Sequence, residues 1–145
     1  MNLKRASLIG LVFAIVSFVT LVLQNSFIAT GITGITVQIL AAALMVWARL
    51  TFGRRSFHAA ASPTEGGLVT SGPYRYLRHP IYAALLYFPW AGVVSHPSMM
   101  SFSLAFLASA GLAVRMFAEE HMVTERYPDY KAYAERTKRV IPFIL

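Results

Sequence analysis

The amino-acid sequence predicts an all-α polytopic integral membrane protein, with about four transmembrane helices and a cytoplasmic amphipathic helix near the C-terminus. Hydrophobic residues make up 57% of the 145 residues and charged residues only 13%, whereas an average soluble domain has roughly 25% charged residues. Two stretches, Ala6 to Ala48 and His79 to Val114, contain no Asp, Glu, Lys or Arg. Each can hold two spanning helices of about 20 mainly apolar residues. The chain length allows one domain, residues 1–145.

The basic residues predict the orientation of these helices. The formal net charge of +7 is by itself compatible with a nucleic-acid partner. However, the two turns expected on the outer side, "LQNSFIATG" and "SHPS", contain none of the thirteen Lys and Arg residues. This is the positive-inside pattern. We therefore expect cytoplasmic N- and C-termini, a cytoplasmic central loop, contact with membrane lipids, and no nucleic-acid partner.

Residues 1–50 are expected to form a transmembrane hairpin. Its helices should cover about Ala6 to Leu23 and Ile32 to Leu50, because "QNSFIATGITG" between them offers the polar and Gly residues that end one helix and start the next. A cleaved signal peptide is the alternative for the start of the chain. The apolar run is longer than a typical signal core and no A-x-A-like site closes it, so we favour an uncleaved helix.

Three segments follow this hairpin. Residues 51–80 are expected to form a cytoplasmic loop, rich in Gly, Ser, Thr and Pro, of a length at which loops are usually functional or disordered. Residues 81–123 should form a second hairpin with an extended last helix. Its first arm, Ile81 to Val94, has only 14 residues and contains Pro89, so it either spans with a bend or is re-entrant. Residues 124–145 are expected to be an amphipathic segment with tyrosines on one face.

The last helix of this second hairpin carries the charged residues that are the strongest candidates for chemistry. Arg115 and Glu119 are one helical turn apart and can pair, and charged groups at the end of a membrane helix often mark a functional site. The alternative is a snorkelling Arg beside a solvated "EEH" cluster. Glu120 lies roughly 100° further round the helix, so we expect it to contribute less than Glu119 to a shared pocket.

The histidines and the absence of cysteine bear on metal binding. The sequence has no Cys, and its four His residues lack metal-ligand spacing, so we expect no metal. His79 alone is compatible with a general base, a donor to a ligand, or a ring that only packs beneath the loop.

Two motifs resemble a known family. "GLVTSGPYRYLRHPIY" is followed one hairpin later by "RMFAEEHMVTERYPDYKAYAERTKRVIPFI". Together they resemble the isoprenylcysteine carboxyl methyltransferase family and its phospholipid methyltransferase relatives, whose signature is an R-H-P-x-Y loop, an R-x-x-x-E-E helix and a Tyr-rich basic tail. The resemblance covers about Glu65 to Leu145.

This resemblance implies a membrane-embedded transferase that uses S-adenosyl-L-methionine as its methyl donor. It implies that Arg115 and Glu119 form the catalytic site, with Arg115 binding the acceptor substrate. Carried over by position, the cofactor-binding residues would be Gly66, Gly67, Leu68, Val69, Tyr74, His79, Pro80, Ile81, Tyr82 and Glu119.

The expected function is therefore methylation of a lipophilic acceptor that reaches the site from the membrane. A carboxylate is the acceptor group that suits Arg115, because guanidinium pairs with carboxylate in a bidentate manner. Two alternatives stay open. The acceptor is a phospholipid amine or a small thiol, or the chain is a non-catalytic membrane interaction protein of the same fold.

Overall fold

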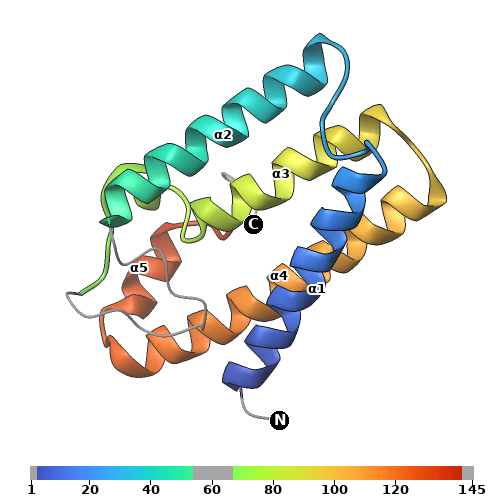
Figure 1. Ribbon diagram of the computed structural model, residues 1–145. Coiled ribbons are helices and arrows are strands. Elements are labelled where there is room, and N and C mark those ends of the chain that lie inside the picture. Colours follow the sequence, from blue (N-terminus) through green and yellow to red (C-terminus); the bar gives the residue numbers. More distant parts are fainter. Residues whose placement is uncertain (1–2, 54–66, 142–145) are drawn as a thin grey trace.

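The computed structural model describes residues 3–53 and 67–141. Within these ranges the chain forms five α-helices and one 3-10 helix, and no named strand (Figure 1). In chain order they are α1 (Leu3–Leu23), α2 (Ile32–Phe52), η2 (Gly72–Arg75), α3 (Pro80–Ser95), α4 (Met99–Arg126) and α5 (Tyr130–Arg136).

Three of these helices, α1, α2 and α4, are long and apolar enough to cross a membrane. The fourth apolar helix, α3, has 16 residues and at about 1.5 Å per residue measures roughly 24 Å, less than the ~30 Å hydrocarbon core. The prediction of an all-α polytopic membrane protein is confirmed. Residues Ile81 to Val94 were expected to be marginal in length, and α3, which contains them, is the shortest of these four apolar helices.

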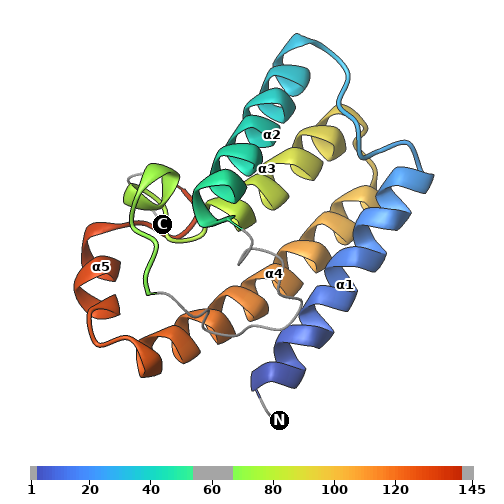
Figure 2. The same ribbon diagram turned by 60° about the vertical axis from the view of Figure 1, so that its left-hand side comes forward.

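The four apolar helices pack as two antiparallel pairs, α1 with α4 and α2 with α3, which lie side by side in two views (Figures 1 and 2). Small residues allow the first pair to approach closely. Gly10 of α1 faces Gly111 of α4, and a Cβ added to either glycine would overlap the carbonyl oxygen of the other. Such contacts between small residues are a common way for helices to associate in lipid.

The connection between α1 and α2 is fastened to α3 by one buried amide. Gln38 of α2 accepts a hydrogen bond from the backbone N–H of Ala29 (3.0 Å) and donates to the carbonyls of Phe27 (2.8 Å) and Phe88 (2.9 Å). Gly92 of α3 lies directly against the backbone of this connection. Because buried backbone groups need partners, Gln38 allows a non-helical segment to sit against apolar helices.

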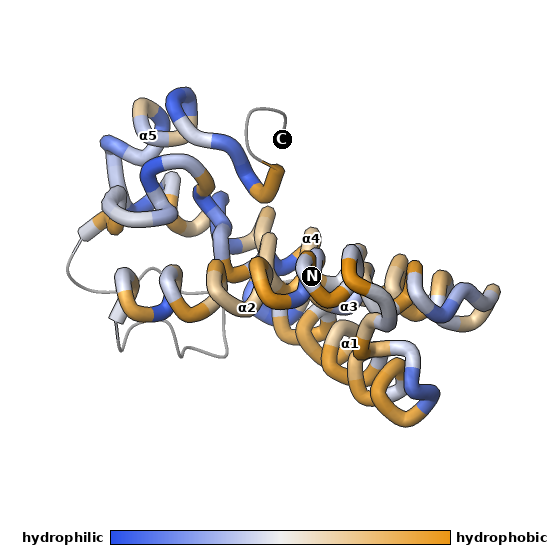
Figure 3. Tube along the Cα trace, turned by 90° about the horizontal axis from the view of Figure 1, so that it is seen from above, coloured by the Kyte–Doolittle hydropathy of each residue, from blue (hydrophilic) through white to orange (hydrophobic). Residues whose placement is uncertain are grey.

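The two ends of the bundle differ in polarity. The α1–α2 connection and the α3–α4 turn lie together at one end, while the start of α1, η2 and α5 lie at the other (Figure 1). Figure 3 shows that hydrophilic residues gather around α5, whereas hydrophobic residues dominate the bundle. His79, Tyr82, Arg115 and Glu119, four of the residues expected to carry chemistry, lie between these regions, where α3 begins and α4 leaves the apolar part of the bundle.

Candidate functional site

A three-residue network joins α3 to α4 at this boundary. The Tyr82 hydroxyl donates to Glu119 Oε1 (2.6 Å) and accepts a hydrogen bond from Arg115 Nε (2.8 Å). Arg115 Nη2 lies 3.4 Å from Glu119 Oε1, one helical turn away. The expected pairing of Arg115 with Glu119 is therefore present, and Tyr82 bridges both partners.

The two charged members of this network differ in solvent exposure. The Arg115 side chain is 7% exposed and the Glu119 side chain 25% exposed. Arg115 also donates from Nη1 to Ser7 Oγ of α1 (3.4 Å), so its guanidinium contacts side chains of three helices. The Glu119 carboxylate is therefore accessible to solvent, whereas the Arg115 guanidinium that pairs with it is buried.

The neighbouring carboxylate, Glu120, is the centre of a second polar group. Arg78 Nε donates to its Oε1 (3.1 Å), and His79 Nε2 lies 3.1 Å from the same oxygen. Arg139 reaches the carboxylate from the C-terminal side, with Nε 3.1 Å and Nη2 3.1 Å from Oε2. We call Arg78, His79, Glu120 and Arg139 the Glu120 cluster.

The segment after α5 docks along the residues that precede α3. Leu77 and Lys138 form an isolated parallel bridge, in which the Lys138 N–H donates to the Tyr76 carbonyl (3.1 Å) and the Arg78 N–H to the Lys138 carbonyl (2.6 Å). The His79 N–H then donates to the Arg139 carbonyl (3.0 Å). We call residues 137–141 the docked segment.

The Arg78 side chain also binds the C-terminal end of α5. Arg78 donates from Nη1 to the carbonyls of Ala134 and Thr137, the second at 3.0 Å. These carbonyls belong to the last turn, which lacks helical partners. In the expected amphipathic C-terminal segment, α5 covers Tyr130–Arg136, and the described residues that follow it, 137–141, form long-range contacts with Arg78 and residues 76–79 in place of further helical turns.

The tyrosine face of α5 is buried against the protein. The Tyr133 hydroxyl donates to the backbone carbonyl of Tyr74 (2.7 Å). Burial raises the pKa of Tyr133 to about 12 and raises the pKa values of Tyr74 and Tyr130 as well. Tyr133 therefore stays protonated at neutral pH and can act as this donor.

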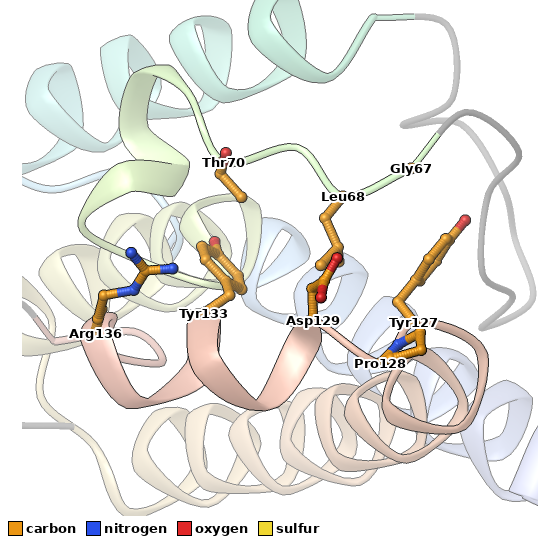
Figure 4. A pocket seen from close by; sticks show the side chains of 8 residues that line it. All are labelled: Gly67, Leu68, Thr70, Tyr127, Pro128, Asp129, Tyr133 and Arg136. Atoms are coloured by element: carbon orange, nitrogen blue, oxygen red, sulfur yellow. The ribbon is translucent and has the colours of Figure 1, made fainter.

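A hollow of about 330 Å³ opens beside α5. Residues before η2 line one side of it and residues from the α4–α5 junction and α5 the other (Figure 4). The lining residues are Gly67, Leu68, Thr70, Tyr127, Pro128, Asp129, Tyr133 and Arg136. In Figure 4, the side chains of Leu68 and Thr70 come from the segment before η2, and those of Asp129 and Tyr133 from the opposite side of the hollow.

The sequence-predicted site residues fall into two groups. His79, Tyr82, Arg115 and Glu119 meet where α3 begins, with the rings of His79 and Tyr82 5.5 Å apart. Gly67 and Leu68 instead line the hollow, whose lining does not include the first group.

The other predicted residues are placed as follows. Pro80 is the first residue of α3 and Ile81 the second, and Tyr74 is buried in η2. Val69 is half-buried in the segment before η2. Gly66 lies outside the described residues. Among those described, no group of three or more His, Asp and Glu residues is placed to hold a metal ion.

Sequence reasoning missed the Glu120 cluster. Glu120 was expected to face away from Glu119, and it does point elsewhere, but to three basic residues and not to solvent. One signal was present in the sequence. The chain has only six acidic residues, and two of them form the "EE" pair on a membrane helix. The "RH" pair before α3 and the basic C-terminal segment offer positively charged partners for such a pair.

Comparisons with known proteins identify the family. The chain matches the family described as "Phospholipid methyltransferase" over residues 27–130. It therefore belongs to the phospholipid methyltransferase family of membrane proteins, and the resemblance seen in its motifs is confirmed.

Two curated relatives extend this finding. The chain is 32% identical to Protein-S-isoprenylcysteine O-methyltransferase B of Arabidopsis thaliana over 119 residues, which cover 77% of this chain and 58% of the relative. It is 29% identical to Nickel-cobalt-cadmium resistance protein NccN of Alcaligenes xylosoxydans xylosoxydans over 126 residues, which cover 83% of this chain and 52% of the relative. The chain thus spans a little over half the length of both relatives. No solved structure matches it.

Proposed function

We propose that this protein is a membrane-embedded methyltransferase that transfers a methyl group from S-adenosyl-L-methionine to a lipophilic acceptor reaching the site from the bilayer. Membership of the phospholipid methyltransferase family supports this reaction class. The observation that carries it is the network of Tyr82, Arg115 and Glu119, in which a partly exposed carboxylate pairs with a buried guanidinium toward the end of a spanning helix.

The residues present fit the proposed cofactor. Its ammonium group needs an acceptor, which the accessible Glu119 carboxylate supplies. Its adenosine portion needs a concave, partly apolar cover, and the hollow formed by Gly67, Leu68 and Tyr133 has a volume within the range of ligand sites. We assign Gly66, Gly67, Leu68, Val69, Tyr74, His79, Pro80, Ile81, Tyr82 and Glu119 to this site. When bound, S-adenosyl-L-methionine supplies an electrophilic methyl group.

The acceptor side of the site is assigned to Arg115. It lies one helical turn deeper in the bundle than Glu119 and its side chain is nearly buried, so a molecule entering from the bilayer approaches it from the apolar side. Its guanidinium, which contacts Tyr82, Ser7 and Glu119, has the planar geometry that pairs with a carboxylate in a bidentate manner. The acceptor we favour is therefore a lipophilic carboxylate, as in a prenylcysteine.

The chain's own contribution to the reaction is alignment and the exclusion of water. Tyr82 is hydrogen-bonded to both Arg115 and Glu119, so it fixes the distance between the acceptor side and the cofactor side. Reactants held in line in a water-excluded site lose little entropy on reaching the transition state. This mechanism uses no nucleophilic side chain.

The same proposal includes the orientation of the chain and its organisation. We place both termini and the 51–80 loop in the cytoplasm, in line with the positive-inside pattern. Residues 1–145 then form a single domain: the 1–50 hairpin, the 51–80 loop with the cofactor motif, the 81–123 hairpin with its extended helix, and the 124–145 segment.

Transfer of a labelled methyl group tests the proposed function. Detergent-purified protein is incubated with methyl-labelled S-adenosyl-L-methionine and, in separate reactions, a farnesylcysteine, phosphatidylethanolamine or a small thiol. We expect a base-labile methyl ester on the farnesylcysteine. Label on the phospholipid amine or the thiol would keep the enzyme class and replace the acceptor. No label on any acceptor, including total membrane lipid, would contradict the proposed function.

A further inference from the structure

Glu120 is largely buried among three basic side chains, although it lies on the part of α4 that extends beyond the apolar bundle. Its side chain is 13% exposed, and those of Arg78 and His79 are 9% and 10% exposed. A buried carboxylate is costly unless it is paired and hydrogen-bonded, and Glu120 has three basic partners from two segments far apart in the sequence. A solvated face would need none of them.

Each partner of Glu120 belongs to a segment that the cluster joins. Arg78 and His79 directly precede α3, and Arg139 lies in the docked segment. Arg139 binds the carboxylate through Nε and Nη2, while its backbone carbonyl accepts the His79 N–H (3.0 Å). Glu120 and the docked segment therefore hold His79 from two sides, at its ring and at its backbone.

His79 in turn adjoins the network proposed to bind the cofactor. Its ring lies 5.5 Å from the ring of Tyr82, and the Tyr82 hydroxyl donates to Glu119. His79 and Tyr82 therefore link the Glu120 cluster to Glu119 through side-chain contacts, in addition to the backbone that joins Glu119 to Glu120.

We propose that Glu120 is a positioning residue: it fastens the docked segment to the start of α3 and thereby holds His79 and Tyr82 in the arrangement that the cofactor needs. The inference rests on the proposed function and adds that docking of residues 137–141 and cofactor binding are coupled. Glu120 does not touch the cofactor. It acts through His79, and Arg139 is its partner in this role.

Two measurements on the full chain in detergent test this coupling. The variants are Glu120→Gln, Arg139→Gln and the double variant. Glu125→Gln is the matched control, because Glu125 is on the same helix and pairs at the surface with His121, with its side chain 68% exposed. Amide hydrogen exchange of residues 76–79 and 137–141 reports docking, and isothermal titration with S-adenosyl-L-methionine reports cofactor affinity.

We expect Glu120→Gln and Arg139→Gln each to speed exchange at both segments and to weaken S-adenosyl-L-methionine binding by about tenfold or more, the equivalent of one charge-assisted hydrogen bond. The double variant should bind no more weakly than the worse single variant, because linked residues are non-additive. Arg139→Lys should recover part of the affinity, since it restores the charge without the planar fork. In the wild type, the cofactor should slow exchange of residues 137–141, as linkage requires.

Several results would overturn the inference. If Glu120→Gln speeds exchange but binds the cofactor like the wild type, Glu120 is only a structural clip. If it weakens binding with exchange unchanged, Glu120 contacts the cofactor directly. Should Glu120→Gln fail to fold, Arg139→Gln gives the same comparison at a more exposed position of the cluster. A wild-type protein that binds no S-adenosyl-L-methionine would instead overturn the proposed function, and the coupling with it.

Discussion

Arg115 is the residue on which the geometry of the site depends most. Its guanidinium contacts Ser7 of α1, Tyr82 of α3 and Glu119 of its own helix. A snorkelling Arg, the alternative reading of the sequence, would extend its charge to water. The Arg115 side chain is instead only 7% exposed, which favours a role inside the site.

We expect Arg115→Lys to keep cofactor binding and lose turnover. The Lys retains a positive charge beside Glu119, but a point charge cannot reproduce the fork that aligns an acceptor carboxylate. Affinity for S-adenosyl-L-methionine, measured by titration, should be nearly unchanged, and kcat should fall strongly. Arg126→Lys on an exposed turn of α4 is the control. If Arg115→Lys abolishes cofactor binding in a folded protein, Arg115 belongs to the cofactor side of the site.

Tyr133→Phe should loosen α5 from η2. The change removes the buried donor to the Tyr74 carbonyl and leaves that oxygen unsatisfied, at a cost of about 1–3 kcal/mol. Thermal unfolding in detergent at neutral pH measures this loss. Tyr76→Phe, at a side chain that is 57% exposed, is the control. An unchanged melting temperature would mean that water replaces the lost donor.

The same residue gives a pH dependence. Burial raises the pKa of Tyr133 from 10.0 to about 12, so the stabilisation is fully present below pH 10 and is lost as the pH rises through 12. Tyr133→Phe should make the alkaline loss of stability shallower. An equally steep loss in the variant would assign it to Tyr74 and Tyr130, whose pKa values burial also raises.

At the scale of the helices, the contact between α1 and α4 depends on two glycines. Replacing Gly by Ala in a helix normally stabilises it by up to about 1 kcal/mol. At Gly10 or Gly111 the added Cβ would meet backbone of the facing helix, and overpacking costs about 1–3 kcal/mol. We therefore expect Gly10→Ala and Gly111→Ala to lower the melting temperature in detergent.

Val12→Ile is the control for this pair of variants. It adds one carbon to an exposed position of α1 and should leave stability unchanged. A higher melting temperature for Gly10→Ala would show that helix propensity outweighs packing, and that α1 and α4 do not approach as closely as described.

The helices themselves could be predicted from the sequence. The charge-free stretches predicted spans over Ala6 to Leu23 and Ile32 to Leu50, and the structure has Leu3–Leu23 and Ile32–Phe52. The reason is that lipid imposes a long apolar helix, and such a pattern is local. The extension of α4 past Arg115 could also be predicted, because no Gly or Pro lies between Arg115 and Pro128.

Contacts between distant segments could not be predicted in this way. Leu77 and Lys138 are 61 positions apart, and Glu120 is 19 to 42 positions from its three partners. No periodicity encodes such pairing, since it depends on how the helices pack. The close placement of Arg115 and Glu119 could be predicted because both lie on one helix, whereas the bridging hydroxyl of Tyr82 required the α3–α4 contact.

At the scale of the whole molecule, the sidedness of the bundle can be tested without any knowledge of the site. A reporter fused after Leu145 and a tag inserted within Ala59 to Thr64 should both be cytoplasmic, because the basic residues favour that side. Protease protection or cysteine labelling of intact cells measures both. If α3 is re-entrant, the tags still stay inside. A reporter on the opposite side at either place would contradict the proposed orientation.

Glu119 is proposed to form part of the site for S-adenosyl-L-methionine, and equilibrium binding to the purified protein tests this role. We expect the wild type to bind and Glu119→Gln, which removes the charge but keeps the size, to bind more weakly by ~1.5–3 kcal/mol, roughly 10- to 150-fold in Kd. The exposed Glu125→Gln on the same helix should bind like the wild type. A wild-type protein that binds no S-adenosyl-L-methionine, or a Glu119→Gln variant that binds it equally well, would rule out this role of Glu119.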